Sequence, residues 1–81
     1  MEEVITTEVC TKYLYNNKLH RIDGPAIEWP NGDKEWYQNG KLHREDGPAI
    51  EYASGSKSWW INGYDITTLK IIFNEFYMKL T

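Results

Sequence analysis

The chain has 81 residues and a formal net charge of −3, because 12 Asp and Glu outnumber 9 Lys and Arg, and 15% of its residues are aromatic. These values predict one small, mildly acidic domain, and the scattered basic residues argue against DNA or RNA, which need a concentrated basic face. The longest apolar runs are three residues, against the roughly 20 that span a bilayer, and the N-terminus is acidic where a signal peptide is basic. We therefore expect a cytoplasmic protein with neither a membrane nor a nucleic acid as partner.

The first segment, residues 1–12, precedes the repetitive part of the chain. Alternation of side chains between Val4 and Tyr15 predicts one or two strands, whose pairing partner the sequence leaves open. Cys10 is the only cysteine and cannot form a disulfide within the chain. We expect a reducing compartment and a free, partly buried thiol.

A repeat of 23 residues organises the rest of the chain. Residues 13–35 and 36–58 are identical at 13 of 23 positions. A third unit, residues 59–66, has Tyr64-Asp65-Ile66 where the first two units have Lys-Leu-His, and the array stops there. Such self-similarity indicates a repeat architecture. The chain is therefore expected to be a single domain with two complete units and a truncated third.

Turn signals divide each unit into short strands. Asn31-Gly32, Asn39-Gly40, Ser54-Gly55 and Asn62-Gly63 supply the positive φ that two-residue hairpin loops need. Aromatic and β-branched residues between these turns favour strands. The Asp-Gly-Pro steps are corners, since proline donates no hydrogen bond to a sheet. The prediction is a mainly β fold, an antiparallel meander of 23-residue hairpin repeats.

Two-residue loops imply a register for these hairpins. With Asn31-Gly32 as the loop, Ile27 faces Trp36, and the second unit repeats this pairing. Because alternate side chains point to opposite faces, one face is expected to form the core. The predicted core face carries Ile27, Trp29, Trp36, Ile50, Tyr52 and Trp59, beside Lys34 and Lys57. The predicted opposite face carries Ala26, Glu28, Tyr37, Ala49, Glu51 and Trp60.

The last segment, residues 67–80, has the periodicity of a helix. Asp65 or Thr67 can cap it, and apolar residues follow at steps of three and four. These apolar residues are Leu69, Ile72, Phe73, Phe76 and Leu80. A repeat array needs a different element to close its end, so we expect this capping helix to cover the last strand or the apolar face.

The sharpest polar signal is His-Arg-x-Asp, which occurs at residues 20–23 and again at residues 43–46. One repeat separates the two copies by two or three strand spacings, roughly 10–14 Å. Two nitrogens on one zinc ion lie only about 4 Å apart, so the two histidines cannot share a metal within a regular sheet. We therefore expect no metal site, no cofactor and no catalytic residues.

Two interpretations of this motif stay open. In the structural one, the aspartate binds backbone N–H groups of the corner and the arginine pairs with Glu28 or Glu51. In the binding one, the arginine, the histidine and nearby aromatic rings of each unit form a cationic, stacking surface for a nucleotide or an acidic partner. The candidate ligand-binding residues are then His20, Arg21, His43 and Arg44.

A second group of candidates lies on the face opposite the predicted core. Tyr37 and Trp60 become exposed interface anchors there if the helix covers the other face. Glu28 and Glu51 share that face in the predicted register. These four residues are the candidate partner-binding site, and an acidic surface steers the chain toward a basic region of a partner.

Residues 13–63 resemble a known type of repeat protein. The unit Leu-His-Arg-x-Asp-Gly-Pro-Ala, followed by Gly, Trp and Asn-Gly, is similar to repeats of bacteriophage and giant-virus proteins, and its spacing resembles that of MORN repeats. The residues that carry the MORN resemblance are Trp36, Asn39-Gly40-Lys41, His43, Gly47, Tyr52, Gly55 and Trp59. The resemblance implies an extended β platform without catalysis, encoded by a phage and directed against a host defence protein.

The expected function is therefore binding rather than catalysis. The leading hypothesis is a protein-interaction module, a phage-encoded inhibitor of a host protein in the host cytoplasm. One alternative is a sponge that sequesters a nucleotide signal. Another is a structural module that assembles into a homo-oligomer, because an open sheet with unpaired edges invites dimerisation.

Overall fold

The structure, a computed structural model, describes residues 1–80, with side chains described for residues 1–73. It is mainly β with one C-terminal helix, which confirms the predicted fold class. The helix α1 is Thr67–Leu80, as predicted. The strands of the described residues are β1 (Glu2–Thr6), β2 (Thr11–Tyr15), β3 (Lys18–Leu19), β4 (Ile27–Glu28), β5 (Lys34–Glu35), β6 (Tyr37–Gln38), β7 (Lys41–Leu42), β8 (Ile50–Glu51), β9 (Lys57–Ser58), β10 (Trp60–Ile61) and β11 (Tyr64–Asp65).

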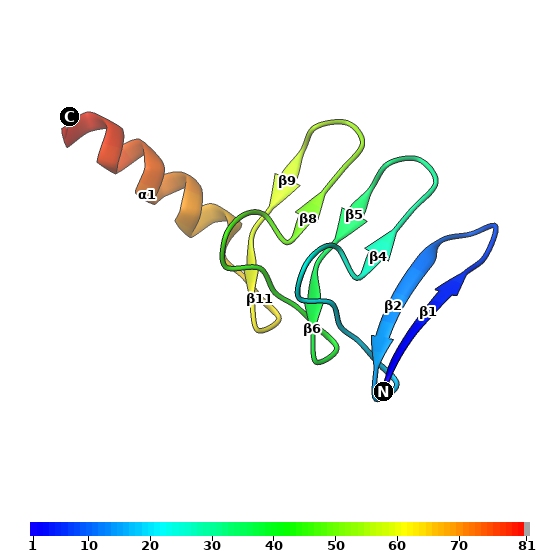
Figure 1. The fold of residues 1–81 in the computed structure, drawn as a ribbon. Coiled ribbons are helices and arrows are strands. Elements are labelled where there is room, and N and C mark those ends of the chain that lie inside the picture. Colours follow the sequence, from blue (N-terminus) through cyan, green and yellow to red (C-terminus); the bar gives the residue numbers. More distant parts are fainter. Residues whose placement is uncertain (81) are drawn as a thin grey trace.

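Antiparallel pairing joins these strands into one long sheet and two small hairpins. The sheet has the order β1-β2-β4-β5-β8-β9, with β3 also paired to β2, while β6 pairs with β7 and β10 with β11. The units follow one another along the molecule, with the β1-β2 hairpin at one end and α1 at the other (Figure 1). The extents are 46 × 25 × 17 Å, so the fold is an elongated platform.

The N-terminal strands find their partners within the sheet. β1 pairs with β2 from Glu2 opposite Tyr15 to Thr6 opposite Thr11, and β2 also pairs with β4. Cys10, in the loop between β1 and β2, is free and buried. The prediction of one or two N-terminal strands is confirmed with two, and β4 of the first repeat is the partner that the sequence left open.

Three hairpins have two-residue loops. Asn39 and Gly40 have φ values of 52° and 79°, and the loop at residues 62–63 has the same conformation, so both predicted turns are confirmed. Asn16 and Asn17, between β2 and β3, have φ values of 51° and 65°. This third loop contains no glycine, and it was not predicted from the sequence. Asparagine nevertheless tolerates positive φ better than most residues.

The loops at the other end of the units are one residue longer than predicted. The Trp29 N–H donates to the Asp33 carbonyl at 3.0 Å, and the Gly32 N–H donates to the Trp29 carbonyl at 3.0 Å. The loop is therefore residues 30–32, with Gly32 at φ 101°, the geometry of a three-residue loop that ends in a left-handed residue. Residues 53–55 form the same loop one unit later.

The longer loops change the register of both hairpins. Ile27 lies opposite Glu35, so its predicted pairing with Trp36 is wrong. Ile50 lies opposite Ser58 in the second unit for the same reason. A shift of one residue turns every side chain of β5 and β9 to the other face.

The two faces of the sheet therefore differ from those predicted. Opposed residues in an antiparallel pair share a face, and alternation adds the residues two positions away. The open face, as we call one side, carries Ile27, Trp29, Glu35, Tyr37, Ile50, Tyr52, Ser58 and Trp60. The corner face carries Ala26, Glu28, Lys34, Trp36, Ala49, Glu51, Lys57 and Trp59. The predicted grouping, which placed Trp36 with Ile27 and Tyr37 with Glu28, is wrong in both units.

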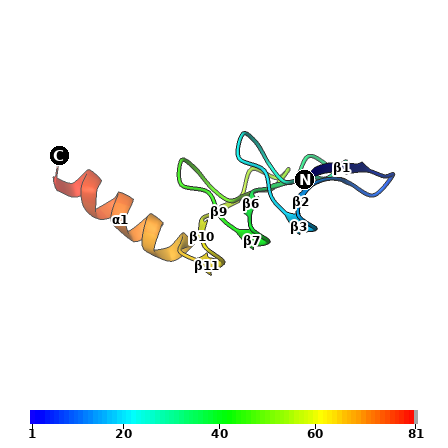
Figure 2. The same cartoon turned by 60° about the horizontal axis from the view of Figure 1, so that its bottom comes forward.

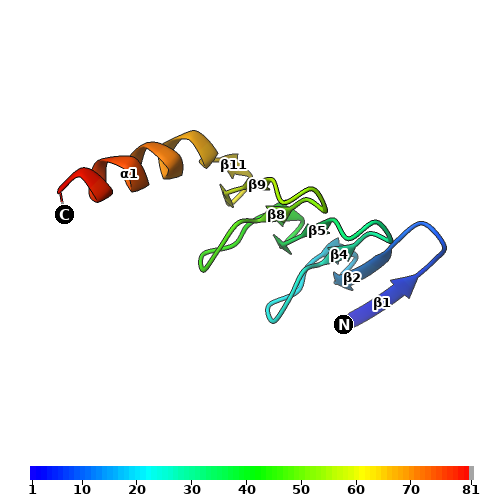
Figure 3. The same cartoon turned by 90° about the horizontal axis from the view of Figure 1, so that it is seen from above.

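The corner face is named after two loops, the corners, formed by residues 20–26 and 43–49. Seen from above, both loops project from the same side of the sheet (Figure 3). Figure 2 shows them apart from the loops at residues 30–32 and 53–55. Ala26 and Ala49, where the corners rejoin the sheet, are 0% exposed. Tyr52 is 43% exposed, so its predicted place in the core is wrong.

The helix begins at a cap and leads away from the sheet (Figure 1). Asp65 Oδ1 accepts hydrogen bonds from the Thr67 hydroxyl at 2.6 Å and the Thr67 N–H at 2.9 Å, which confirms one predicted cap. Beyond this turn α1 leads away from the array (Figure 1), and Leu69 and Ile72 are exposed. The predicted covering of a strand or apolar face is therefore wrong for Leu69 and Ile72. The predicted Phe76 and Leu80 lie outside the residues whose side chains are described.

Candidate functional site

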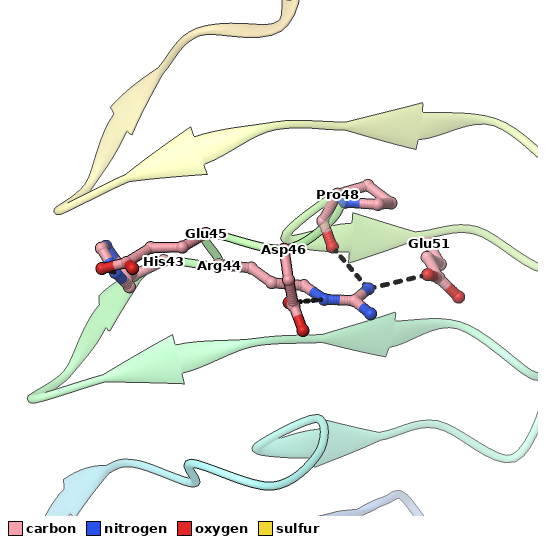
Figure 4. A network of polar contacts seen from close by, with 6 residues as sticks. All are labelled: His43, Arg44, Glu45, Asp46, Pro48 and Glu51. Atoms are coloured by element: carbon pink, nitrogen blue, oxygen red, sulfur yellow. Dashed lines mark hydrogen bonds and ion pairs between the residues drawn. The ribbon is translucent and has the colours of Figure 1, made fainter.

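Arg44 closes the second corner (Figure 4). Its Nε donates to Asp46 Oδ1 at 3.0 Å, and its Nη1 donates to the Pro48 carbonyl at 3.1 Å and to Glu51 Oε2 at 2.9 Å. Its Cζ lies 3.9 Å from the centroid of the Trp36 ring. One guanidinium group thus binds two carboxylates, a carbonyl and an aromatic face, which are the partners its planar fork favours.

Arg21 repeats this arrangement in the first corner. Its Nε donates to Asp23 Oδ1 at 3.2 Å and its Nη1 donates to the Pro25 carbonyl at 3.2 Å. The same Nη1 lies 3.5 Å from Glu28 Oε1, and the Cζ lies 3.8 Å from the centroid of the Tyr13 ring. The corner is therefore a repeated structural device.

The structural interpretation of His-Arg-x-Asp is confirmed for the arginines and wrong for the aspartates. Glu28 and Glu51 pair with the arginines as predicted. Asp23 and Asp46 accept from the guanidinium Nε, not from backbone N–H groups. The reason is that a charged donor two residues earlier makes a stronger bond with a carboxylate than a neutral backbone N–H does.

The corner glycines permit a close approach between side chain and backbone. A Cβ added to Gly47 would lie 2.8 Å from Arg44 Cζ, and one added to Gly24 would lie 2.9 Å from Arg21 Cζ. Both distances are shorter than real carbon contacts. Glycine is therefore needed in Asp-Gly-Pro so that the guanidinium can pack against the corner.

The histidines join successive units. His20 Nδ1 accepts the Asn39 N–H and His43 Nδ1 accepts the Asn62 N–H, both at 3.0 Å. Because a nitrogen that accepts carries no proton, each neutral ring holds its proton on Nε2. His43 is 6% exposed, and its Nε2 lies 3.2 Å from Glu45 Oε1. Both Nδ1 atoms are thus occupied by the next unit's turn.

Two equivalent grooves lie beside the corners. One, of about 420 Å³, separates the two corners, and the other, of about 410 Å³, separates the first corner from β1. The side chain of Asp46 is 87% exposed, whereas that of Arg44 is 21% exposed. The corners therefore present carboxylates to solvent and shelter their guanidinium groups, which suits a basic partner better than a phosphate.

Hydrogen bonds hold three aromatic side chains of the open face in place. Glu35 accepts the Trp29 Nε1–H at 2.6 Å and the Tyr37 hydroxyl at 3.0 Å. Burial, together with the hydrogen bond to Glu35 and its negative charge, raises the pKa of Tyr37 to about 12. In the second unit, Ser58 Oγ accepts the Trp60 Nε1–H at 3.0 Å. Glu35 of β5 and Ser58 of β9, at equivalent positions of the two units, thus fix aromatic rings that include the first residues of the next unit.

The predicted partner-binding residues fall on two different faces. Tyr37 and Trp60 lie on the open face, while Glu28 and Glu51 lie on the corner face and pair with the arginines. Glu35 was missed because only the correct register places it between two aromatic rings. The signal that could have revealed it is Pro30, since proline before Asn-Gly favours the longer loop.

The chain is an array of β-hairpin repeats with a terminal helix. Among the described residues, no cluster of three or more His, Cys, Asp or Glu side chains is suited to a metal ion, and no helix has the length and apolarity to cross a membrane. No family model, curated protein or solved structure matches the chain. The resemblance of residues 13–63 to phage-type and MORN repeats therefore stays a prediction.

Proposed function

We propose that this chain is a non-enzymatic protein-interaction module that binds a partner protein through its open face. The observation that carries this proposal is the grouping of four aromatic side chains from three successive units on the side without corners. They are Trp29, Tyr37, Tyr52 and Trp60. Tryptophan and tyrosine dominate the energetically important positions of protein interfaces.

Preorganisation of these rings supports the proposal. Trp29 and Tyr37 are held by Glu35, and Trp60 is held by Ser58, so a partner meets side chains that are already ordered. Ordering a mobile side chain costs roughly 0.5–1.5 kcal/mol on association, and here the fold supplies that order beforehand. The open face is therefore suited to binding a flat, partly apolar surface.

Net charge adds a general attraction to this binding. The net charge of −3 speeds the encounter with a partner that carries a basic region. From the phage-type resemblance, we extend the proposal to an inhibitor of a host protein in the host cytoplasm. The arginine–glutamate contacts disfavour a nucleotide sponge, because a phosphate would compete with Glu28 and Glu51 for the two guanidinium groups.

The test uses the tagged protein as bait in a host lysate, followed by titration of the captured partner. The double variant Tyr37→Ala with Trp60→Ala, and separately the milder Tyr52→Ala, should weaken binding more than about tenfold. Tyr64→Ala is the matched control, since Tyr64 is exposed but lies on the terminal hairpin. Circular dichroism should show that Tyr52→Ala stays folded. Equal capture by wild type and both open-face variants would contradict the proposal.

A further inference from the structure

The C-terminal edge of the sheet lacks the partner that the inner units have. β5 pairs with β8 of the next unit, whereas β9, its equivalent one repeat later, pairs with β8 alone in the described chain. Hydrogen-bonded pairs recur at every second position along an antiparallel ladder. Tyr52 and Ser56 form such a pair, so Ile50 and Ser58, two positions further along, also form one. Lys57 therefore points its N–H and C=O groups outward, away from β8.

A second feature of the same end is an aromatic ring without its cation. Tyr13, Trp36 and Trp59 occupy equivalent positions in the three units. The first two lie under Arg21 and Arg44, but the position equivalent to these arginines in the third unit is Thr67. Within residues 1–73, no guanidinium group lies over the Trp59 ring.

Thr67 ends the chain's own array without closing this edge. Its Oγ1 accepts the Trp59 N–H at 2.9 Å, in place of the Ala49 carbonyl that accepts the Trp36 N–H. α1 then leads away from the sheet (Figure 1). The chain therefore satisfies the backbone at Trp59 and leaves the edge of β9 open beside it.

We propose that this edge receives an extended segment of a partner protein, which adds to β9 as an antiparallel strand. The inner interface specifies the chemistry of that segment. There, Glu51 lies opposite Lys34 and Ile50 opposite Glu35, and Arg44, six residues before Ile50, covers Trp36.

At the open end, the partner segment places a carboxylate opposite Lys57, an apolar residue opposite Ser58 and an arginine over Trp59. Backbone hydrogen bonds give such strand addition its affinity, and the side chains give it specificity. The edge is distinct from the open face, so this inference does not rest on the proposed function.

The probe is a synthetic peptide with the sequence of residues 43–52, which contains the arginine, the apolar residue and the glutamate in the required spacing. Titration into isotope-labelled protein should give saturable binding and shift the amide signals of Lys57 and Ser58 and the indole signal of Trp59. Replacing the peptide's arginine by alanine should weaken binding about fivefold, because the cation over the ring is lost.

Lys57→Pro is the decisive variant. Proline removes the outward N–H but none of the bonds between β8 and β9, so the hairpin keeps its register and peptide binding falls about tenfold. Lys12→Ala, at an exposed residue of β2, removes one positive charge as Lys57→Pro does and should bind normally. Tyr52→Ala should also bind the peptide normally, which separates this test from that of the open face.

Three results would overturn the proposal. The first is binding no tighter than that of a scrambled peptide, and the second is equal binding by wild type and Lys57→Pro. The third is concentration-dependent dimerisation of the wild type that Lys57→Pro abolishes, since that would assign the edge to a second copy of this chain.

Discussion

The guanidinium carbon of Arg44 lies 3.9 Å from the centroid of the Trp36 ring, and the same group binds Glu51 at 2.9 Å. Trp36 directly follows β5 and Glu51 lies on the neighbouring β8, so the Arg44 side chain connects the corner to two neighbouring segments of the sheet. This contact matters for the stability of the fold because the apolar core is small. The described residues that are buried and hydrophobic are Cys10, Ala26, Ile27 and Ala49. Polar and cation–π contacts at the corners therefore contribute much of the order of the array.

Removal of the Arg44 side chain should destabilise the fold. Arg44→Ala loses charge-assisted hydrogen bonds and leaves Glu51 without its cation, and we expect the free energy of unfolding to fall by about 2–3 kcal/mol. Arg44→Lys keeps the charge but not the planar fork and should recover less than half of this loss. Urea unfolding measures both, with exposed Lys12→Ala as control. A loss under about 0.5 kcal/mol for Arg44→Ala would show that the corner is held by its backbone alone.

Gly47 should be intolerant of a methyl group only while Arg44 is present. The added Cβ would lie 2.8 Å from Arg44 Cζ, so Gly47→Ala should lower the free energy of unfolding by about 1–3 kcal/mol, a typical effect of overpacking. In the Arg44→Ala background, the same substitution should have little effect. A double-mutant cycle by chemical denaturation measures this coupling. Additive losses would mean that the backbone, and not the guanidinium, requires glycine.

The hydroxyl of Tyr37 should ionise later than an ordinary tyrosine. Its pKa is raised to about 12, so the folded state holds the proton more tightly than the unfolded state, whose tyrosine ionises near pH 10. The corresponding stability is complete below about pH 10 and falls as the pH rises from about 10 through 12. Tyrosinate absorbance in an alkaline titration should show this late component, and Glu35→Gln should shift it to lower pH. An unchanged titration in Glu35→Gln would contradict the assigned role of Glu35.

The start of α1 should weaken in acid. Hydrogen bonds from the Thr67 hydroxyl and then from its N–H lower the pKa of Asp65 below its ordinary value of 3.8. A lowered folded-state pKa means that the stabilisation is present above about pH 4, near the unfolded value, and is lost as the pH falls through the folded value. Helical circular dichroism should decline over this range. Asp65→Asn should remove this part of the decline, and an identical acid transition in the variant would exclude Asp65 as its source.

Local sequence chemistry accounts for the units of this fold and for their tight turns. The recurrence of Asp-Gly-Pro and Asn-Gly predicted two units and a fragment, and Asn39-Gly40 has the two-residue turn that its residues favour. The helix from residue 67 also follows from local signals, because a cap at Asp65 and apolar spacing need no distant partner. The arginine–glutamate pairs were predictable as well, because each arginine and its glutamate are seven residues apart in the same unit. Their pairing therefore does not depend on the register between strands.

The faces of the sheet depended on loop length and on contacts between units. A single extra residue in the loop before Asp33 moved Trp36 and Tyr37 to the opposite faces from those predicted, because strand side chains alternate. The alternation by itself does not show which face is buried. The position of α1 likewise depends on a tertiary contact. Thr67 stands at the repeat position of Arg21 and Arg44, and its hydroxyl binds the Trp59 N–H where a third corner would otherwise begin. Apolar periodicity shows that a helix has an apolar side but not which surface meets it. Hydrogen bonds between residues about 20 positions apart, such as that from the Asn62 N–H to His43, decided how the units stack.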